Sequence, residues 1–245
     1  MKRFGLIGKT LKHSFSKKYF AEKFSKENIT DSRYDLFELR TIVELTDLIQ
    51  STVGLEGFNV TIPYKQEVMP FLTNLDHSAE RVGAVNVVKI VGEQLIGYNS
   101  DYYGFKASLS RWLSNDVDSA LVLGTGGSSK AVLVALEDLN IKYQNVSRSA
   151  KEGCITYSDI QENPDMLSDV QLIINTTPLG TFPAVDEMAS LPVNAFHTGH
   201  HVFDLVYNPS MTKLMRVAKE QGAKTKNGLE MLELQAEKSW EIWNS

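Results

Sequence analysis

The glycine-rich turn in the middle of the chain restricts the possible folds more than any other feature. Residues 120–123 form an uninterrupted apolar run, Ala-Leu-Val-Leu, and Gly124-Thr125-Gly126-Gly127 follows directly. The pattern after the turn predicts a helix over residues 128–139. A continuous apolar run of this length is typical of a strand buried on both faces of a parallel sheet. Strand, glycine turn and helix in this order therefore predict an α/β sheet covered by helices.

The glycines of this turn have the spacing of a phosphate-binding loop. Gly124 permits unusual backbone angles in a tight turn, and Gly126 lets backbone N–H groups approach a pyrophosphate. The start of the following helix adds N–H donors and the positive end of the helix dipole. Ser129 replaces the third glycine of the full pattern, so a plain strand-to-helix turn is the alternative. The turn predicts a dinucleotide site at Gly124, Gly126, Gly127 and Ser128.

Arg148 follows the next predicted strand, at the position that distinguishes NAD from NADP. Sites that prefer NAD place Asp or Glu here to bind the ribose 2′-hydroxyl. This segment reads Ser147-Arg148-Ser149, and an arginine offers a planar fork of donors suited to a 2′-phosphate. A solvated surface arginine is the alternative interpretation. We expect NADP(H) as the cofactor, with Arg148 and Ser149 among its ligands.

The alternation of strands and helices divides the chain into two α/β units, of which the second begins near Asp101. In the first unit the pattern favours a mostly parallel sheet covered by helices. The last helix carries an apolar face that includes Trp240 and Trp243. The strands are expected over residues 4–7, 33–39, 58–61, 85–91, 95–98, 120–123, 142–146, 170–174 and 202–206.

Composition and charge exclude several classes of function. The chain has 245 residues, with 25 Lys and Arg against 30 Asp and Glu, and the net charge of −5 argues against nucleic acid as a partner. The apolar runs are too short to span a bilayer, and no secretory signal is visible. The single cysteine, Cys154, cannot form an internal disulfide, which favours the cytoplasm. His197, His200 and His201 match no metal-ligand spacing, so we expect a polar loop there and no metal site.

Polar side chains lie near the predicted strand ends of the first unit. Hydroxyls, amides, one ammonium and one carboxylate together suit a small anionic substrate that is rich in hydroxyl groups. We expect Lys65 one turn into a helix that follows the strand ending at Thr61. Each residue also has a purely structural alternative, such as a strand-end cap for Asn59 or an N-cap for Asp101. The candidates are Ser14, Ser16, Asn59, Thr61, Lys65, Asn86 and Asp101.

A series of motifs, in order along nearly the whole chain, carries a resemblance to a known family. They are His13-Ser14-Phe15-Ser16, Asn59-Val60-Thr61-Ile62-Pro63-Tyr64-Lys65, Gly83-Ala84-Val85-Asn86, Asn99-Ser100-Asp101, Gly124-Thr125-Gly126-Gly127, Ser147-Arg148-Ser149, Asn175-Thr176-Thr177-Pro178-Leu179-Gly180, Asp204-Leu205-Val206-Tyr207-Asn208-Pro209, and Asn227-Gly228-Leu229-Glu230-Met231-Leu232 with Gln235. The set resembles the shikimate dehydrogenase family. The resemblance implies a two-domain enzyme of chorismate and aromatic amino acid biosynthesis that reduces 3-dehydroshikimate to shikimate with NADPH.

The resemblance also implies domain limits and a role for each matching residue. Residues 1–100 with 229–245 would bind substrate, because the last helix returns to the first domain, and residues 101–228 would form a Rossmann-like NADP-binding domain. Lys65 and Asp101 would be the catalytic acid–base pair. The substrate ligands would be Ser14, Ser16, Asn59, Thr61, Asn86, Tyr207 and Gln235, and the cofactor would also meet Thr176, Leu205, Gly228 and Met231.

Three departures from the family pattern concern the cofactor domain. The family often has Asn-Arg-Thr where Ser147-Arg148-Ser149 stands, and a basic residue usual after that motif is displaced, with Lys151 one place early and Glu152 in its stead. The segment from residue 148 to 175 is short, so one helix is expected to be reduced to a loop. The alternatives are a quinate or shikimate dehydrogenase of looser cofactor use and a non-catalytic NADPH-binding sensor. As partners we expect a small-molecule substrate, neither nucleic acid nor membrane, and a monomer or homodimer.

Overall fold

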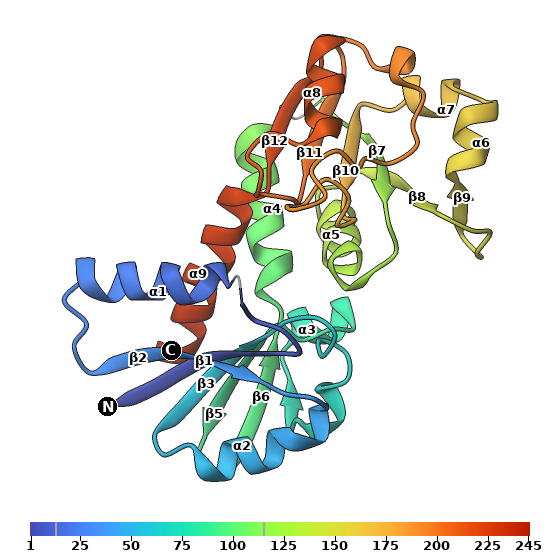
Figure 1. The fold of residues 1–245 in the computed structure, drawn as a ribbon. Coiled ribbons are helices and arrows are strands. Elements are labelled where there is room, and N and C mark those ends of the chain that lie inside the picture. Colours follow the sequence, from blue (N-terminus) through green and yellow to red (C-terminus); the bar gives the residue numbers. More distant parts are fainter. Residues whose placement is uncertain (13, 115) are drawn as a thin grey trace. The chain divides into compact units, whose positions relative to one another are not determined.

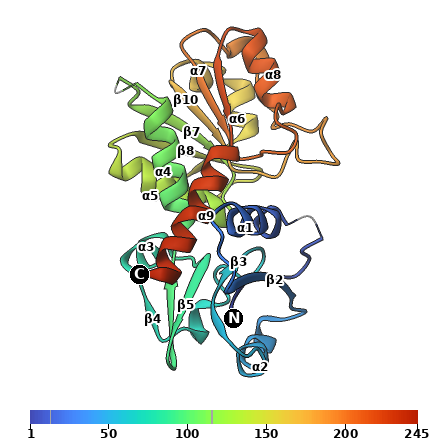
Figure 2. The ribbon, with the colours of Figure 1, turned by 90° about the vertical axis from the view of Figure 1, so that its left-hand side faces the viewer.

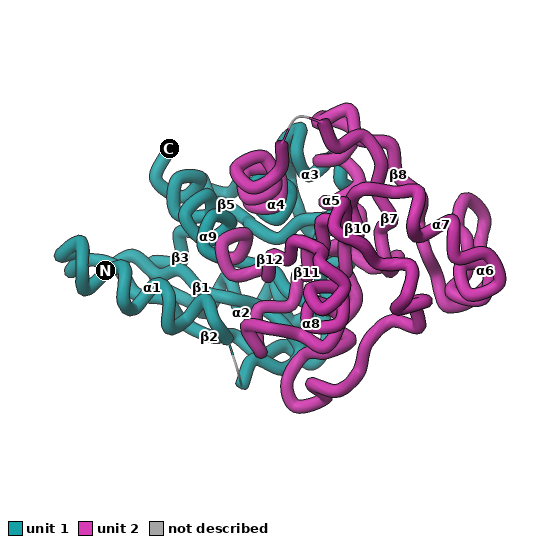
Figure 3. Tube along the Cα trace, turned by 90° about the horizontal axis from the view of Figure 1, so that it is seen from above, with its two compact units in different colours: residues 1–103, 233–245 teal, residues 104–232 magenta. Residues whose placement is uncertain are grey.

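The chain forms two compact units (Figure 3), the first made of residues 1–103 and 233–245, the second of residues 104–232. The structure is a computed structural model that describes residues 1–12, 14–114 and 116–245. Two helices contribute residues to both units: α4 (Ser100–Trp112) and α9 (Leu229–Asn244). No helix within these described ranges is long and apolar enough to cross a membrane.

Unit 1 is built on a six-stranded sheet in the order β2-β1-β3-β5-β6-β4. Strands β1, β2 and β3 are parallel, whereas β5 is antiparallel to both β3 and β6. Helix α1 and the end of α9 cover one face with an aromatic cluster, and α2 covers the other face (Figure 1). The elements are β1 (Lys2–Gly8), α1 (Phe15–Lys26), β2 (Ser32–Glu38), η1 (Ile42–Glu44), α2 (Leu45–Ser51), β3 (Leu55–Val60), η2 (Met69–Phe71), β4 (Asn74–Leu75), α3 (His77–Val82), β5 (Val87–Val91) and β6 (Gln94–Tyr98).

The aromatic cluster of unit 1 depends on a glycine in the sheet. Trp243 of α9 stacks on Phe4 of β1 with ring centroids 4.8 Å apart. A Cβ atom at Gly57 would lie 2.4 Å from the Trp243 ring, so only glycine leaves the indole room against β3. The indole N–H donates to the Val88 carbonyl at 3.0 Å. The end of α9 is thereby held on the sheet that carries the first part of the chain.

Unit 2 is a fully parallel six-stranded sheet in the order β12-β11-β10-β7-β8-β9. Helices α6, α7 and α8 pack on one face, and α4 lies on the other (Figure 2). There Phe105 of α4 meets Phe203 of β11 with ring centroids 5.2 Å apart. The elements are β7 (Ser119–Leu123), α5 (Gly127–Asp138), β8 (Lys142–Ser147), β9 (Cys154–Thr156), α6 (Tyr157–Glu162), α7 (Asp165–Ser168), β10 (Leu172–Asn175), η3 (Val193–Ala195), β11 (His201–Asp204), α8 (Lys213–Glu220) and β12 (Lys224–Asn227).

The short segment after residue 148 has one helix replaced by a loop, as expected, because residues 148–153 connect the parallel strands β8 and β9 without a helix. After β9 the chain forms two short helices, of which α6 begins with a reciprocal capping box of Thr156 and Asp159 and buries Ile160. Two local expectations from the sequence are wrong. Lys65 lies in consecutive turns that start at Ile62, not in a helix. His200 and His201 are buried, the latter at the start of β11, although a polar loop was expected.

Candidate active site

The polar candidates of unit 1 gather at one edge of its sheet. Strand β3 ends there, and the chain leads on to Lys65. Because β5 runs antiparallel to β3 and β6, Asn86 just before β5 and Asn99 just after β6 lie at this same edge. The backbone N–H of Asn86 donates to the Tyr98 carbonyl at 3.1 Å. Strand direction alone therefore brings together residues that are far apart in sequence.

Lys65 and Asp101 form an ion pair, with 2.6 Å from the lysine Nζ to the aspartate Oδ2. The side chains are 16% and 6% exposed, so water screens the pair little. The Lys65 carbonyl accepts a hydrogen bond of 2.7 Å from the Val85 N–H, which fixes the backbone at this turn. The pair is a proton donor held in one place beside a fixed carboxylate, an arrangement suited to general acid–base catalysis.

Asp101 does not have the N-cap role that was its structural alternative. It lies in the first turn of α4, where the side chain of Asn99 accepts the Tyr102 N–H at 3.0 Å. The Asn99 amide also donates to the Ala84 carbonyl at 2.9 Å. Asn99 thus caps the helix, and the Asp101 carboxylate is left for Lys65.

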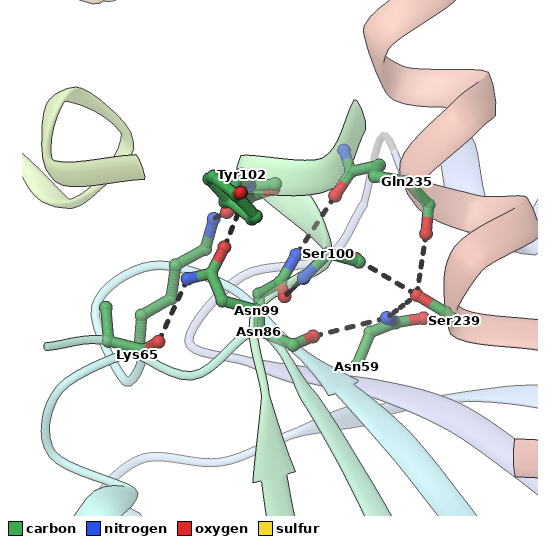
Figure 4. Close-up of polar contacts among 10 residues, drawn as sticks. Asn59, Lys65, Asn86, Asn99, Ser100, Tyr102, Gln235 and Ser239 are labelled. Atoms are coloured by element: carbon green, nitrogen blue, oxygen red, sulfur yellow. Dashed lines mark hydrogen bonds and ion pairs between the residues drawn. The ribbon is translucent and has the colours of Figure 1, made fainter. Parts of the chain in front are cut away.

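Asn86 joins this edge to α9 (Figure 4). Its amide oxygen accepts the Ser100 N–H at 2.7 Å, and its amide nitrogen donates to the Ser100 hydroxyl at 3.0 Å and to the Gln235 amide oxygen at 3.1 Å. Asn86 is 3% exposed. Figure 4 shows the amide nitrogen of Gln235 pointing away from Asn86. The two amides therefore hold each other so that Gln235 offers N–H donors rather than its oxygen.

Asn59 lies in the same network, beside β5 and α9. Its amide nitrogen donates to the Asn86 carbonyl at 3.2 Å and to the Ser239 hydroxyl at 2.9 Å (Figure 4). Its amide oxygen accepts from the Tyr34 hydroxyl at 2.8 Å. Ser239 in turn donates to the Gln235 carbonyl at 2.8 Å. This one amide therefore links β2, β3 and α9 with the segment just before β5.

The three hydroxyl candidates of unit 1 have different surroundings. Ser14 is the N-cap of α1 and accepts the Lys17 N–H at 3.4 Å, a long contact that leaves most of its hydrogen-bonding capacity for other partners. Ser16 is half-buried, near enough to Tyr34 that its side chain lowers the pKa of that phenol, against the larger effect of burial, which raises it. Thr61 is also half-buried, directly after β3. His13, which belongs to the same motif as the two serines, lies outside the described residues.

The dinucleotide candidates of unit 2 lie where the strand order of its sheet reverses. Numbered within the unit, β7 is the first strand, with the second and third strands on one side and the fourth to sixth on the other. In open parallel sheets, ligands bind beyond the carboxyl ends of the strands at such a reversal. A cavity of about 380 Å³ lies there, lined by Gly124, Thr125, Gly126, Val146, Ser147, Arg148, Tyr157, Thr176, Thr177, Pro178 and Leu179.

The glycines of the turn are needed for different reasons. Gly124 has φ +106°, and a Cβ there would lie 2.8 Å from the Thr176 hydroxyl, so protein packing alone demands glycine. A Cβ at Gly126 or Gly127 would meet no atom within 4 Å. Gly126 is the N-cap of α5 and has no side chain to satisfy the first N–H groups of that helix. Its open surroundings and the N–H donors of the helix start fit a phosphate group.

Arg148 lies just beyond β8 and lines the same cavity, with its side chain exposed. Tyr157 lines the cavity as well, and burial raises the pKa of its phenol although the nearby Arg148 guanidinium lowers it. Ser147 is buried and donates its hydroxyl to the Ser149 carbonyl, so it shapes the loop. Ser149 is exposed and Ser128 half-buried. An exposed cation at the rim of the cavity, without a carboxylate among the lining residues that the structure describes, fits a 2′-phosphate.

The other cofactor candidates have mainly backbone roles in the structure. Thr176 donates its hydroxyl to the Leu123 carbonyl at 2.7 Å, which ties the loop after β10 to β7. A Cβ at Gly228 would lie 2.1 Å from the carbonyl oxygen of Leu205, so glycine permits the close approach of these two segments. Met231 is buried, and Tyr207, a candidate for the substrate rather than the cofactor, is half-buried.

Sequence reasoning missed three residues of these sites. Tyr34 lies in the middle of a strand and Ser239 inside a helix, where neither matches a motif. Tyr157 starts a short helix that the pattern did not reveal. For Ser239 a weak signal exists, since it is a small polar residue four positions after Gln235 on an otherwise apolar helix face. Only the tertiary structure shows that these side chains reach the sites.

Fold and sites define a class of α/β proteins in which one unit has the strand order and glycine turn of a dinucleotide-binding domain and the other carries a buried Lys–Asp pair. The "Shikimate dehydrogenase (NADP(+))" of Clostridium perfringens is 38% identical over 254 residues, covering 100% of this chain and 93% of that protein. The chain therefore belongs to the shikimate dehydrogenase family.

Further comparisons agree with this assignment. A family model described as "Shikimate dehydrogenase substrate binding domain" matches residues 6–88. Shikimate dehydrogenase 1 of Peptoclostridium difficile is 35% identical, with a TM-score of 0.82 over 100% of this chain and 92% of that one. Shikimate 5-dehydrogenase of Thermus thermophilus, solved with NADP(H) and shikimate, is 27% identical, with a TM-score of 0.86 over 99% of this chain and 93% of that one.

Proposed function

We propose that this protein is an NADPH-dependent shikimate dehydrogenase, which reduces 3-dehydroshikimate to shikimate in chorismate and aromatic amino acid biosynthesis. The observation that carries the proposal is the buried Lys65–Asp101 pair of 2.6 Å at the polar edge of unit 1. It supports an enzyme rather than a passive NADPH-binding protein, because a sensor has no need of a proton donor held by a carboxylate.

The substrate is assigned to unit 1. Its carboxylate calls for hydroxyl donors, which Ser14 and Ser16 supply at the start of α1. Its ring hydroxyls call for groups that both donate and accept, and amides meet this need. We assign the hydroxyls to Asn59, Thr61, Asn86 and Gln235. Tyr207, which belongs to unit 2, is retained as a substrate ligand only on the family resemblance.

NADP(H) is assigned to unit 2, where NADPH when bound supplies the hydride for the reduction. Gly126, Gly127 and Ser128 at the start of α5 fit its pyrophosphate. Arg148 and Ser149 fit the 2′-phosphate, and Arg148 takes the place of the carboxylate typical of NAD sites. Gly124, Thr176, Leu205, Gly228 and Met231 complete the proposed cofactor site, and their contacts support its walls.

Lys65 provides the proton for the reduction. As the carbonyl carbon is reduced, negative charge develops on the carbonyl oxygen, and an ammonium directed at that oxygen stabilises the transition state. Lys65 then donates its proton to this oxygen, and in the reverse reaction it accepts a proton from the substrate hydroxyl. Asp101 holds the lysine in position and accepts a hydrogen bond from a neighbouring substrate hydroxyl. A general acid of this kind accelerates a reaction by about 10²- to 10⁴-fold.

The proposal also includes the setting of the enzyme. The single cysteine, Cys154, supports a cytoplasmic location, where internal disulfides are not used. The partner is a small molecule. The protein is proposed to be a monomer or a homodimer, since the residues of each assigned site come from one chain.

Steady-state oxidation of shikimate and of quinate, each with NADP⁺ and with NAD⁺, tests the proposed function. We expect shikimate with NADP⁺ to give the highest kcat/KM of the four combinations. Turnover that favours quinate or NAD⁺ would instead identify a quinate dehydrogenase of looser cofactor use. Binding of NADPH without turnover of either substrate would contradict the enzymatic proposal.

A further inference from the structure

Tyr34 is a buried residue that no motif singles out, yet its phenol meets two substrate candidates. It lies in β2 opposite Phe4 of β1, is 7% exposed, and stacks on Phe20 with ring centroids 4.5 Å apart. Its hydroxyl donates to the Asn59 amide oxygen at 2.8 Å, and the side chain of Ser16 lies near enough to lower the pKa of the phenol, against the larger effect of burial. One phenol thus connects the start of α1 with the end of β3.

The hydrogen bonds of Asn59 leave a single orientation for its amide. The Asn86 carbonyl can only accept, so the amide nitrogen must face it, at 3.2 Å. The second N–H donates to Ser239 at 2.9 Å. Burial raises the pKa of Tyr34, so the phenol keeps its proton at neutral pH and needs an acceptor, which is the amide oxygen of Asn59. Both N–H groups of Asn59 are therefore in use within the protein.

We propose that Tyr34 is a positioning residue of the substrate site, which holds the Asn59 amide so that it presents one remaining lone pair to a substrate hydroxyl. Asn59 then acts on the substrate as an acceptor and not as a donor. Ser239, 1% exposed, is the second support, since it receives the N–H on the other side of the amide. This inference rests on the proposed function, because it concerns the same substrate site.

The contribution of Tyr34 is testable with Tyr34→Phe, which keeps the ring stacked on Phe20 and removes only the hydroxyl. We expect the KM for shikimate to rise about five- to tenfold, the effect of one lost hydrogen bond, while kcat and the KM for NADP⁺ change less than about twofold. Tyr143→Phe is the matched control, since its hydroxyl bonds Glu137 of unit 2, and it should leave every constant unchanged.

A double-mutant cycle tests whether Tyr34 acts through Asn59. In an Asn59→Ala background, Tyr34→Phe should add less than about a twofold loss in kcat/KM, because the group that it orients is gone. Ser239→Ala should show the same lack of additivity, and it serves as the second variant where Tyr34→Phe lowers the yield of folded protein. Fully additive losses in both cycles would overturn the positioning role.

A measurement in the ligand-free protein separates this inference from the proposed function. The side-chain amide protons of Asn59, assigned by ¹⁵N NMR through their loss in Asn59→Ala, should be well resolved and slow to exchange. They should shift and exchange faster in Tyr34→Phe and remain unchanged in Tyr143→Phe. A wild type without shikimate turnover but with this NMR response would refute the proposed function alone, whereas unaffected Asn59 resonances would refute the role of Tyr34.

Discussion

At the scale of single residues, the two proposed sites depend on charges whose partners differ in kind. Lys65 is paired within the protein, with Asp101 at 2.6 Å, so its charge is compensated before any substrate binds. Arg148 is exposed at the rim of the unit 2 cavity, where a 2′-phosphate would be its partner. The first charge is suited to proton transfer and the second to recognition, which leads to opposite kinetic expectations for their removal.

Replacement of Lys65 should lower kcat far more than substrate affinity. In Lys65→Met we expect kcat to fall by about 10²- to 10⁴-fold, because the proton donor is lost, with the KM for shikimate within a few-fold of wild type. Lys18→Met is the control, since Lys18 is 82% exposed and pairs with Glu22 at the surface. Near-normal kcat with a raised KM would instead make Lys65 a binding residue.

Replacement of Arg148 should change the choice of cofactor. In Arg148→Ala we expect the ratio of kcat/KM for NADPH to that for NADH to fall by about 10- to 100-fold, because hydrogen bonds to a charged phosphate are lost. The kcat/KM for NADH should hardly change. An unchanged ratio would show that Arg148 does not bind the 2′-phosphate.

At the scale of elements, the glycine turn between β7 and α5 combines two separate requirements. Gly124 is needed by the protein itself, since its φ is +106° and Thr176 lies against it. Gly126 has ordinary backbone angles, φ −84° and ψ −173°, and open space where a side chain would be. Stability should therefore depend on Gly124, and cofactor binding on both.

The pair Gly124→Ala and Gly126→Ala separates these requirements. We expect Gly126→Ala to keep the wild-type Tm while the KM for NADPH rises about tenfold or more, because the methyl group blocks the approach of the pyrophosphate. Gly124→Ala should lower the free energy of unfolding by about 1–3 kcal/mol through backbone strain and contact with Thr176. Thermal melts and NADPH titrations of both variants provide the test. A Gly126→Ala variant with wild-type NADPH affinity would remove the turn from the cofactor site.

At the scale of the whole molecule, stability should depend on pH through a buried histidine of unit 2. His200 has no solvent exposure, and its ring centroid lies 3.8 Å from that of His197, with the two rings tilted by 31°. Burial, with a smaller effect of the His197 charge, lowers the pKa of His200 to about 4. The folded protein therefore keeps His200 neutral at a pH where the unfolded chain, with a pKa near 6.5, binds a proton.

Because the unfolded chain binds this proton more readily, the free energy of unfolding decreases as the pH falls. The contribution of His200 is fully present above pH 6.5, and it is lost progressively as the pH falls from 6.5 to about 4, amounting to roughly 3 kcal/mol in total. We expect His200→Asn to flatten the dependence of the free energy of unfolding on pH in this window, measured by urea denaturation. The exposed His77→Asn is the control. Identical slopes for wild type and His200→Asn would contradict the prediction.

Much of the fold followed from local sequence patterns, because those patterns reflect local physics. The apolar run at residues 120–123 forms β7, and the glycine turn and helix after it lie as predicted. The hairpin around Gly92 forms as β5 and β6. The short helices α6 and α7 were not predicted, because six and four residues are too few to show a helical period.

By itself the sequence determined which residue types stand at the strand ends: the lysine and aspartate of the proposed catalytic pair, the amides beside them and the glycines of the turn. Only the tertiary structure decided their use, since Asn59 meets Tyr34, Asn86 and Ser239 over separations of 25, 27 and 180 residues. Burial of the histidines at 200 and 201 was likewise invisible in the pattern. The physical reason is that hydrogen-bond partners and solvent exposure depend on which segments pack together, and packing is not a property of any one segment.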